Sequence, residues 1–599
     1  MEKQQLEQIR HSCAHLVAAA VQALYPEAKF GVGPVIENGF YYDIEFPENI
    51  KEEDLGKIEA KARELAKQGL AFERKEIKID DAIKYFESVG QNYKVELLND
   101  LKTKGTTKMS AEELQDVGGA VENVSLYQTG EFADLCRGPH IETTKGLNLS
   151  GLKLMRLAGA YWRGKSDNPQ LQRIYGVYFE TKNELTDYLN LLAEAEKRDH
   201  RKIGAEQELF FFDDRVGKGQ VLWLSNGTII RNEVEKLALE SEEAGNYLRV
   251  RTPHLAKEEL FLTSGHLPYY KDSMYPPMVM DDGTYYLKAM NCPHHHTVYN
   301  FKPHSYRELP MRLAEYGECF RNELSGTLAG LLRVRAMAMN DAHIYCTKDQ
   351  IKDEFKKVME MVMEYFRIFK LEDYWFRLSK WSPDHLEKYV NEPDNWNYSE
   401  GIIREVLQEM KVKFVEAEDE AAFYGPKVDV LFKSVVGREE TMSTIQLDFV
   451  AKARFGLKYT DCEGKENNEV FVIHRAPLST HERFMAFLIE HFAGVWPVWM
   501  SPVQIMFAPV GEKHWEGAQK MADEFKLAGV RVEVDSADET VGNKVRKAVG
   551  RKIPYIVVVG DKELAGGELM VRVRGEEKPA KFAKEEFLAR VQREIKDRV

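Results

Sequence analysis

The chain has 599 residues, of which 44% are hydrophobic and 30% charged, and its formal net charge is −14. This composition is typical of a globular protein with several domains and excludes an intrinsically disordered chain. The negative charge excludes a protein that binds nucleic acid over its whole surface, although local basic patches stay compatible with RNA binding. The sequence has no apolar run long enough to span a membrane, and its six cysteines show no close pairing, so we predict a multidomain cytoplasmic protein.

The predicted elements form successive segments along the chain. Residues 31–46 alternate strand-forming residues with Gly, Pro and Asn, and a helical pattern over 54–68 follows, which indicates an α+β domain over 1–182. Charged, helix-favouring residues over 183–202 predict a helix that links two domains. The segment 203–500 mixes short strands with amphipathic helices and is expected to be the largest domain.

A small α/β domain is predicted over 501–599. Its apolar runs at 503–510, 530–536 and 554–560 read as buried strands, and helical patterns separate them. Buried strands that alternate with helices favour a largely parallel sheet.

The first group of chemically useful residues consists of two pairs with the same spacing. His11 and His15 lie four residues apart in a helical pattern, so their imidazoles share one face. Cys136 and His140 are also four apart, but the Gly-Pro between them predicts a turn. If the two pairs converge, they suit a zinc ion with an open position or a hydrolytic site. The alternative is two unrelated pairs, one on a helix and one in a loop.

With the neighbouring strings GPVIENGFYYD and AGAYWRG, these pairs resemble the editing domain of threonyl-tRNA synthetases, which is similar to that of alanyl-tRNA synthetases. The resemblance implies hydrolysis of serine wrongly attached to tRNA(Thr), without a bound metal. It also implies Tyr42, Lys94 and Asp134 as polar neighbours of the pocket. An uncharged histidine can act as base for the attacking water, and Lys94 can stabilise the developing oxyanion.

The second group contains arginines. GECFRNELSGTLAGLLRVRAM holds Arg321, Glu323 and Arg333, and HRAPLSTHERF holds Arg483. Guanidinium groups bind carboxylates and phosphates through paired hydrogen bonds, although an Arg-x-Glu alone is equally a surface ion pair. Together the two stretches resemble the second and third signature motifs of class II aminoacyl-tRNA synthetases, which build their ATP site on an antiparallel sheet. In agreement, the sequence has no glycine motif of the Rossmann or P-loop type.

The resemblance implies a role for each of these residues. Arg321 would bind the amino-acid carboxylate and the α-phosphate of ATP, and Glu323 the adenine amino group. Arg333 and Arg483 would bind the β- and γ-phosphates, with Mg²⁺ bridging the phosphates. Met337 stands where the family carries the phenylalanine that stacks on adenine. The rate enhancement would then come from positioning the amino-acid carboxylate against the α-phosphorus and from neutralising the charge of the phosphates.

The third group concerns the amino acid. Cys292, His343 and His474 are far apart in sequence and, taken singly, read as ordinary core residues. Their local strings MNCP, DAH and IHR resemble those of threonyl-tRNA synthetases, which implies that the three bind one Zn²⁺. A Cys/His/His set leaves one tetrahedral position open, where the amino group and hydroxyl of threonine would bind. The resemblance implies these residues around threonine: Met290, Arg321, Asp341, Tyr424, Lys427 and Gln446.

The selectivity expected of the Cys292/His343/His474 cluster gives a reason for the second, hydrolytic cluster near the N-terminus. An apolar pocket separates threonine from its isostere valine by only about 10²-fold, whereas a metal that requires a hydroxyl rejects valine strongly. Serine keeps the hydroxyl and lacks one methyl group, which is worth only about 1–3 kcal/mol. Serine is therefore expected to pass the first site and to require a second, hydrolytic one.

The segment 501–599 resembles the anticodon-binding domain of threonyl, prolyl, glycyl and histidyl enzymes. The resemblance implies Glu563 and Arg572 as readers of the anticodon, and the alternative is a strand-turn-strand with solvated charges. Pro253 stands where the first class II motif, which forms the dimer, places its proline, so a homodimer through the catalytic domain is implied.

The implied architecture is therefore an α+β editing domain over 1–182, a helical linker over 183–202, an antiparallel-sheet class II catalytic domain over 203–500 and an α/β anticodon-binding domain over 501–599. Many family members carry a TGS domain before the editing domain, and this chain is expected to lack it.

Some positions depart from the family pattern. Met339 replaces an amide near the amino acid, and His294 replaces a glycine. The leading hypothesis is a threonine–tRNA ligase that also hydrolyses seryl-tRNA(Thr). The alternatives are a hydrolase with only the N-terminal site active and a tRNA-binding regulator without charging activity, which Met337 and Met339 make conceivable.

Overall fold

The computed structural model describes residues 3–106, 121–165, 167–434 and 439–599. Contacts divide the chain into two compact units, Met1–Leu192 and Ala193–Val599, which are described separately. Across the described residues, every helix is too short or too polar to cross a lipid bilayer.

The first unit is built on an antiparallel sheet and the long helix α1. Its sheet runs in the order β1-β3-β8-β7, with β2 paired to β3. The small and branched side chains of α1 pack against this sheet and against α2 to form the core of the unit. The elements are α1 (Lys3–Leu24), β1 (Lys29–Phe30), β2 (Val35–Ile36), β3 (Gly39–Glu45), α2 (Leu55–Lys67), β7 (Leu152–Tyr161) and β8 (Gln170–Tyr178).

A second, smaller sheet of the first unit carries its own helices. Strands β4, β5 and β6 are antiparallel neighbours, and α3 and α4 pack together beside them. The elements are β4 (Phe72–Lys78), α3 (Ile79–Ser88), α4 (Asn92–Lys104), β5 (Asn123–Thr129) and β6 (Phe132–Leu135). The α+β character predicted for this segment is confirmed.

The helix predicted over 183–202 is interrupted. The structure has α5 (Lys182–Arg198) and then α6 (His200–Glu206). Between them, the Asp199 side chain accepts a hydrogen bond from the N–H of Arg201 and caps α6. A prediction of one continuous helix was wrong here because an aspartate at an N-cap starts a new helix.

The second unit is dominated by a large, mostly antiparallel sheet. Its order is β11-β15-β16-β23-β20-β19-β17-β18, and only its outermost pairs are parallel. The strands are β11 (Leu248–Arg249), β15 (Met311–Phe320), β16 (Ala336–Cys346), β17 (Tyr374–Ser379), β18 (Phe414–Ala417), β19 (Lys427–Lys433), β20 (Glu439–Asp448) and β23 (Phe471–Ala476). The antiparallel catalytic sheet implied by the class II resemblance is confirmed.

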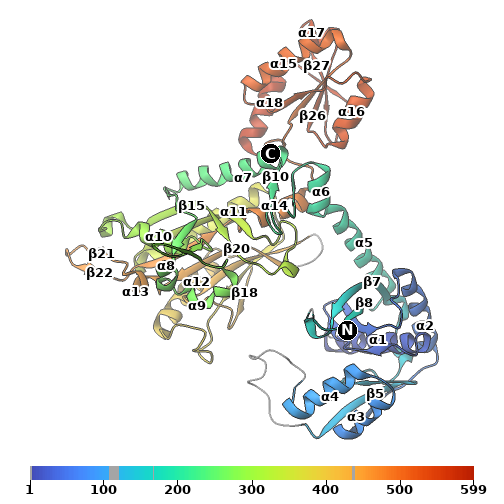
Figure 1. Ribbon diagram of the computed structural model, residues 1–599. Helices are drawn as coiled ribbons and strands as arrows, with labels where there is room; N and C mark the ends of the chain where they lie inside the picture. The colour runs from blue at the N-terminus through green and yellow to red at the C-terminus, as the bar shows by residue number, and fades with distance from the viewer. Residues whose placement is uncertain (1–2, 107–120, 166, 435–438) are drawn as a thin grey trace. The chain divides into compact units, whose positions relative to one another are not determined.

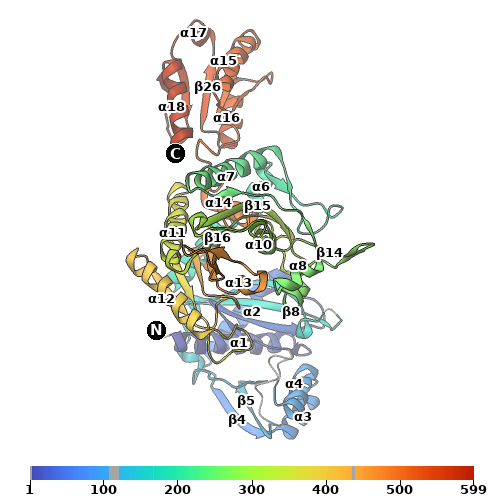
Figure 2. The same ribbon diagram turned by 90° about the vertical axis from the view of Figure 1, so that its left-hand side faces the viewer.

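One face of this sheet is covered by helices, and α11 and α12 lie side by side in Figure 2. The residues of β16 alternate between the two faces: Ala342, Ile344 and Cys346 belong to the helix-packed core. Asp341 and His343 therefore point to the opposite, open face. The covering helices are α7 (Ser225–Ala244), α11 (Ile351–Ile368), α12 (Pro393–Glu409) and α14 (His481–Phe492).

Shorter elements surround the open face of the large sheet. A small sheet in the order β12-β14-β13 carries α8 beside it, and α10 precedes the long β15 in the chain. These elements are β12 (Leu255–Lys257), α8 (Glu258–Thr263), α9 (His266–Tyr269), β13 (Met278–Met280), β14 (Gly283–Leu287), α10 (Cys292–Tyr299), α13 (Ala451–Phe455), β21 (Tyr459–Thr460) and β22 (Glu466–Asn467).

The C-terminal part has a sheet between helices (Figure 1). The strands β25, β24 and β26 are parallel, as the alternating pattern predicts, whereas β27 and β28 continue the sheet in antiparallel fashion. Helices α15 and α18 pack on one face and α16 on the other. The elements are β24 (Ile505–Pro509), α15 (Trp515–Leu527), β25 (Val532–Val534), α16 (Val541–Gly550), β26 (Tyr555–Val559), α17 (Asp561–Leu564), β27 (Leu569–Val573), β28 (Ala580–Phe582) and α18 (Lys584–Asp597).

Candidate active sites

A cavity of about 570 Å³ lies on the open face of the large sheet. Strands β16, β19, β20 and β23 supply its floor, so residues from distant parts of the sequence meet there. The sequence-predicted residues that line it are Met290, Cys292, Arg321, Glu323, Asp341, His343, Tyr424, Lys427, Gln446, His474 and Arg483.

Cys292, His343 and His474 form a cluster at this cavity. His343 on β16 and His474 on β23 are direct register partners, and Cys292 begins α10 beside them. The candidate ligand atoms of all three lie within 4.8 Å of one another. His343 Nε2 is buried and has no hydrogen-bond partner among the described residues, and burial lowers the pKa of His343 well below 6.5. A neutral imidazole with a free nitrogen, a second histidine and a thiol match the donor set of Zn²⁺.

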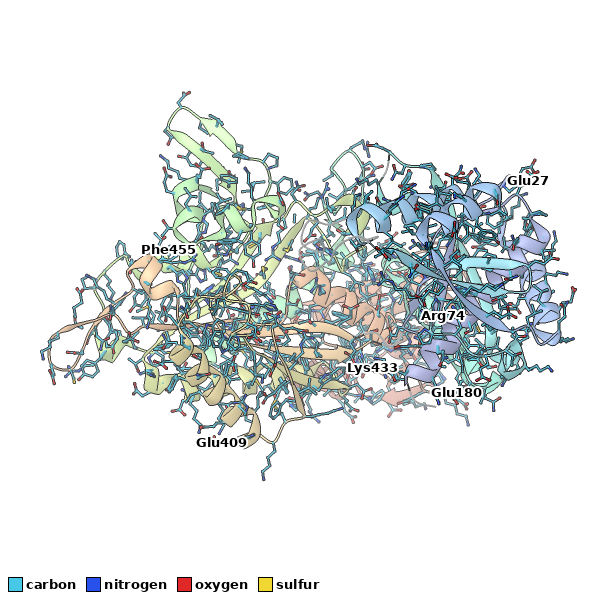
Figure 3. All side chains as sticks on the ribbon, turned by 90° about the horizontal axis from the view of Figure 1, so that it is seen from below. Glu27, Arg74, Glu180, Glu409, Lys433 and Phe455 are labelled. Carbon is cyan, nitrogen blue, oxygen red and sulfur yellow. The ribbon has the colours of Figure 1, made fainter. Side chains whose placement is uncertain are left out.

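Aromatic rings enclose the side of this cluster formed by α10. The ring of Phe455, labelled in Figure 3, lies 4.8 Å from the ring of His296. The ring of Tyr424 is stacked at 5.6 Å from His474. Together with Cys292 and His474, these rings line a second, small cavity of about 30 Å³.

The residues predicted around threonine lie next to the cluster. Asp341 Oδ2 accepts a hydrogen bond of 2.7 Å from the Asn291 side chain, which fixes the carboxylate. The Tyr424 hydroxyl donates to the Gln446 carbonyl. Lys427 is register partner to Gln446.

Lys427 has a neighbour that the sequence analysis missed. Asp429, two residues further along β19, forms ion pairs of 3.0 Å with both Lys427 and Arg377. Asp429 and Arg377 line the same cavity, as does His266. The two-residue spacing places Asp429 on the same face as Lys427 and was a usable signal, whereas His266 follows no pattern.

The arginines differ in how they are held. Arg321 Nε donates to the Ala289 carbonyl at 3.3 Å, and its Nη2 lies 3.9 Å from the sulfur of Met339. Arg483 Nε donates to the carbonyl of Leu332 at 3.2 Å. Both guanidinium groups thereby keep donors available toward the cavity.

Glu323 and Arg333 form an ion pair with each other. Arg333 Nη2 lies 2.8 Å from Glu323 Oε2, and Arg333 does not belong to the cavity lining. Met337 is also outside the lining, because it is buried with Cys319 and Val334. The ATP contacts that the resemblance implies for Glu323, Arg333 and Met337 therefore stay predictions.

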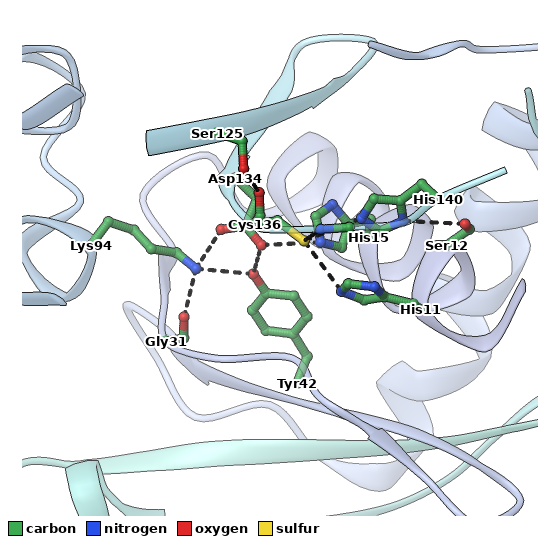
Figure 4. Close-up of polar contacts among 11 residues, drawn as sticks. His11, Ser12, His15, Gly31, Tyr42, Lys94, Ser125, Asp134, Cys136 and His140 are labelled. Carbon is green, nitrogen blue, oxygen red and sulfur yellow. Dashed lines mark hydrogen bonds and ion pairs between the residues drawn. The ribbon is translucent and has the colours of Figure 1, made fainter. Parts of the chain in front are cut away.

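In the first unit, the structure brings the two His/Cys pairs together (Figure 4). Cys136 Sγ lies 3.3 Å from both His11 Nε2 and His140 Nε2, and the four ligand atoms, including that of His15, are within 4.8 Å of one another. The interpretation of two unrelated pairs was therefore wrong. Burial lowers the pKa of His11, and burial together with its histidine neighbours lowers the pKa of His140 to about 2. Neutral histidines thus line the pocket at physiological pH.

A polar network adjoins these histidines. Lys94, 3% exposed on α4, forms an ion pair with Asp134 and donates to the Gly31 carbonyl at 2.6 Å. Its Nζ lies 3.3 Å from the Tyr42 hydroxyl, which itself donates to Asp134. His15 Nε2 is 3.5 Å from Asp134 Oδ2. Asp134 thus connects the ammonium group to the histidine cluster.

The two residues predicted to read the anticodon lie on separate elements. Glu563 accepts a hydrogen bond of 2.9 Å from the N–H of Gly560 and caps α17. Arg572, on β27, lines a largely apolar cavity of about 230 Å³ with Ile553 and Ile556. Their role in anticodon reading stays a prediction.

Comparisons with known proteins identify the family. Residues 278–492 match the "tRNA synthetase class II core domain (G, H, P, S and T)", residues 504–594 the "Anticodon binding domain", and residues 124–175 the "Threonyl and Alanyl tRNA synthetase second additional domain". The threonine–tRNA ligase of Geobacillus sp. (strain WCH70) is 46% identical over 592 residues, which are 99% of this chain and 89% of that protein. The chain belongs to the threonyl-tRNA synthetase family. It is thus a class II aminoacyl-tRNA synthetase with an editing domain.

Further relatives agree with this assignment. Threonine–tRNA ligase 1 of Bacillus subtilis (strain 168) is 45% identical over 592 residues, 99% of this chain and 89% of that protein. The crystal structure of the RNA binding domain of threonyl-tRNA synthetase from Cryptosporidium parvum Iowa II superposes with a TM-score of 0.63 at 31% identity. That match covers 66% of this chain and 98% of the other, so the synthetase family accounts for the fold as well as the sequence.

Proposed function

We propose that this protein activates threonine with ATP, transfers threonine to tRNA(Thr) and hydrolyses seryl-tRNA(Thr). The observation that carries the proposal is the convergence of Cys292, His343 and His474 within 4.8 Å in the cavity that also holds Arg321 and Arg483. A site suited to a metal ion that can bind a substrate hydroxyl thus adjoins two arginines suited to binding a carboxylate and a triphosphate.

Selection of threonine would depend on the cluster and on Asp341. A bound Zn²⁺ would supply an open position for the amino group and hydroxyl of the substrate, which valine cannot fill. Asp341 would accept the hydroxyl proton in a hydrogen bond, since Asn291 holds only its Oδ2. Tyr424 and Gln446 would border the methyl side of the substrate.

Formation of the adenylate needs positioning and charge neutralisation. The threonine carboxylate attacks the α-phosphorus of ATP, and pyrophosphate leaves. Arg321 would hold both reacting groups, and Arg483 the departing phosphates, to which Mg²⁺ would bind. Glu323 and Arg333, once separated from each other, would take the adenine amino group and the γ-phosphate.

Hydrolysis of seryl-tRNA would take place at the cluster of the first unit. A neutral His11 can accept a proton from the attacking water, because burial keeps its pKa low. The Lys94 ammonium, held by Asp134 and Gly31, is preorganised to stabilise the oxyanion of the ester. This part of the proposal needs no metal.

The test is amino-acid-dependent ATP–pyrophosphate exchange with threonine, serine and valine, before and after zinc removal. The proposal requires strong exchange with threonine, weaker exchange with serine, none with valine and loss without zinc. A folded, zinc-bound protein without exchange for any amino acid would support the tRNA-binding regulator, which the similarity to curated ligases does not favour. A homodimer through the catalytic domain and a cytoplasmic location belong to the same proposal.

A further inference from the structure

Two buried carboxylates lie behind the histidines of the metal cluster. Asp448, at the end of β20, is 6% exposed, and its Oδ2 lies 3.1 Å from His474 Nε2. Glu315, on β15, is 5% exposed and acts one step further away. Its Oε2 lies 3.2 Å from His295 Nε2, and His295 Nδ1 lies 2.7 Å from His343 Nδ1. A chain of hydrogen bonds therefore connects each histidine of the cluster to a buried carboxylate, directly for His474 and through His295 for His343.

These contacts determine where the ring protons reside. Burial raises the pKa of Glu315, but the hydrogen bonds that it accepts outweigh this and bring the pKa to about 2, so the group is a carboxylate. A carboxylate only accepts, so His295 carries its proton on Nε2 and presents Nδ1 as an acceptor. His343 must then donate from Nδ1, which leaves a free lone pair on its buried Nε2, an atom without a hydrogen-bond partner among the described residues. By the same rule, His474 directs its Nε2 proton to Asp448, so Nδ1 is the nitrogen that remains for a metal.

We infer that Glu315, acting through His295, and Asp448 are positioning residues that fix which nitrogen of His343 and His474 can bind the metal. The inference rests on the proposed zinc site and deepens it. Outer partners of this kind contribute about 10–100-fold to metal affinity in other sites.

Backbone groups hold both carboxylates in one orientation. Glu315 Oε1 accepts from the N–H of Thr252 at 2.7 Å. Asp448 Oδ1 accepts from the N–H groups of Val450 and Ala451 at 2.7 and 2.9 Å. If Glu315 or Asp448 is replaced by the corresponding amide, these backbone N–H groups should bind the carbonyl oxygen of the amide. Its NH₂ group would then face the histidine and donate a hydrogen bond to it. Glu315→Gln and Asp448→Asn thus reverse the tautomers with little change in volume.

Zinc affinity of the full chain, measured by competition with a chromophoric chelator, tests the inference. Cys292→Ser first identifies the equivalent of zinc that belongs to this site. Glu315→Gln and Asp448→Asn are expected to raise the Kd of that equivalent by about 10–100-fold. Glu354→Gln is the matched control, because Glu354 is 2% exposed in the same unit but accepts two hydrogen bonds from Arg312 and one from Lys357. It should retain the parental Kd.

The outcomes separate the inference from the proposed function. Parental zinc affinity in both Glu315→Gln and Asp448→Asn would overturn the inference. A parent without any Cys292-dependent zinc would instead overturn the zinc site itself. In the zinc-free chain with ¹⁵N-labelled histidine, spectra should show His343 protonated on Nδ1 and unprotonated on Nε2, and the opposite tautomer would also overturn the inference.

One more variant separates two roles for Asp448. Its carboxylate also lies within 4.8 Å of His296 and His474, a set that could itself hold an ion. If Asp448 only positions His474, His296→Ala leaves zinc affinity unchanged. A loss as large as that in Asp448→Asn would make Asp448 a ligand and refute its assignment as a positioning residue.

Discussion

His343 and His474 face each other across neighbouring antiparallel strands, with ring centroids 4.5 Å apart. Only the pairing of β16 with β23 brings these residues together, since 130 positions separate them in the chain. The metal cluster is therefore a property of strand register, and its chemistry can be tested residue by residue.

Replacing His343 should abolish threonine activation. His343→Ala removes a donor with a free, buried nitrogen and leaves two residues to hold the ion, so threonine-dependent ATP–pyrophosphate exchange should fall to background. His514→Ala is the control, because His514 is also buried but bonds Asp561 in the C-terminal part. Exchange that survives in His343→Ala with parental rejection of valine would disprove the zinc assignment.

Arg321 is expected to act through the paired hydrogen bonds that its planar guanidinium group can donate. Arg321→Lys keeps the charge but cannot make two parallel hydrogen bonds, so kcat for adenylate formation should fall by about 10²-fold. The exposed Arg307→Lys in the same unit serves as the control. Unchanged kcat with a higher KM for threonine would assign Arg321 to substrate binding alone.

Lys94 is expected to be required for hydrolysis of seryl-tRNA(Thr) and dispensable for threonine activation. Lys94→Met removes the ammonium that faces Asp134, so deacylation should slow by about 10²-fold. Lys102→Met, on the same helix but exposed and paired with Asp80, controls for changes to α4. Circular dichroism of both variants checks folding, and equal deacylation rates would exclude Lys94 from the reaction.

The buried imidazoles predict a loss of stability in acid. Burial and the neighbouring histidines lower the pKa of His140 to about 2, whereas the unfolded chain takes up this proton near pH 6.5. The stabilisation is therefore complete above that pH and falls below it by about 1.4 kcal/mol per pH unit. Hydrogen-exchange protection of α1, corrected for intrinsic rates, should decline from pH 6.5 to 5. His140→Asn should flatten this decline, and an identical profile in both proteins would contradict the prediction.

The sequence predicted the residues of the cavity better than their partners. Cys292, His343 and His474, which line one cavity, were predicted because their local strings resemble those of threonyl-tRNA synthetases. Glu315 and Asp448 were missed, since their contacts depend on which strands pair and on which face each side chain lies. Strand pairing over long sequence separations is not encoded in any local pattern.

Other differences concern an ion pair, a buried side chain and a helix cap. Glu323 and Arg333 form an ion pair, and Met337 is buried with Cys319 and Val334. A motif that implies contacts with ATP does not indicate which side chains these residues contact within the protein. The break at Asp199 is different, because its capping side chain was visible in the sequence and outweighed by the helix-favouring residues around it.

The side chains of β16 point alternately into the cavity and into the hydrophobic core. Asp341 and His343 face the cavity, while Ala342 and Ile344 pack under the helices on the other side. Insertion of a single residue before this stretch would exchange the two sets, placing a carboxylate among apolar side chains and aliphatic groups in the cavity. Substitutions in this strand can therefore alter the substrate specificity of the site, whereas an insertion or deletion would disrupt both the cavity and the core.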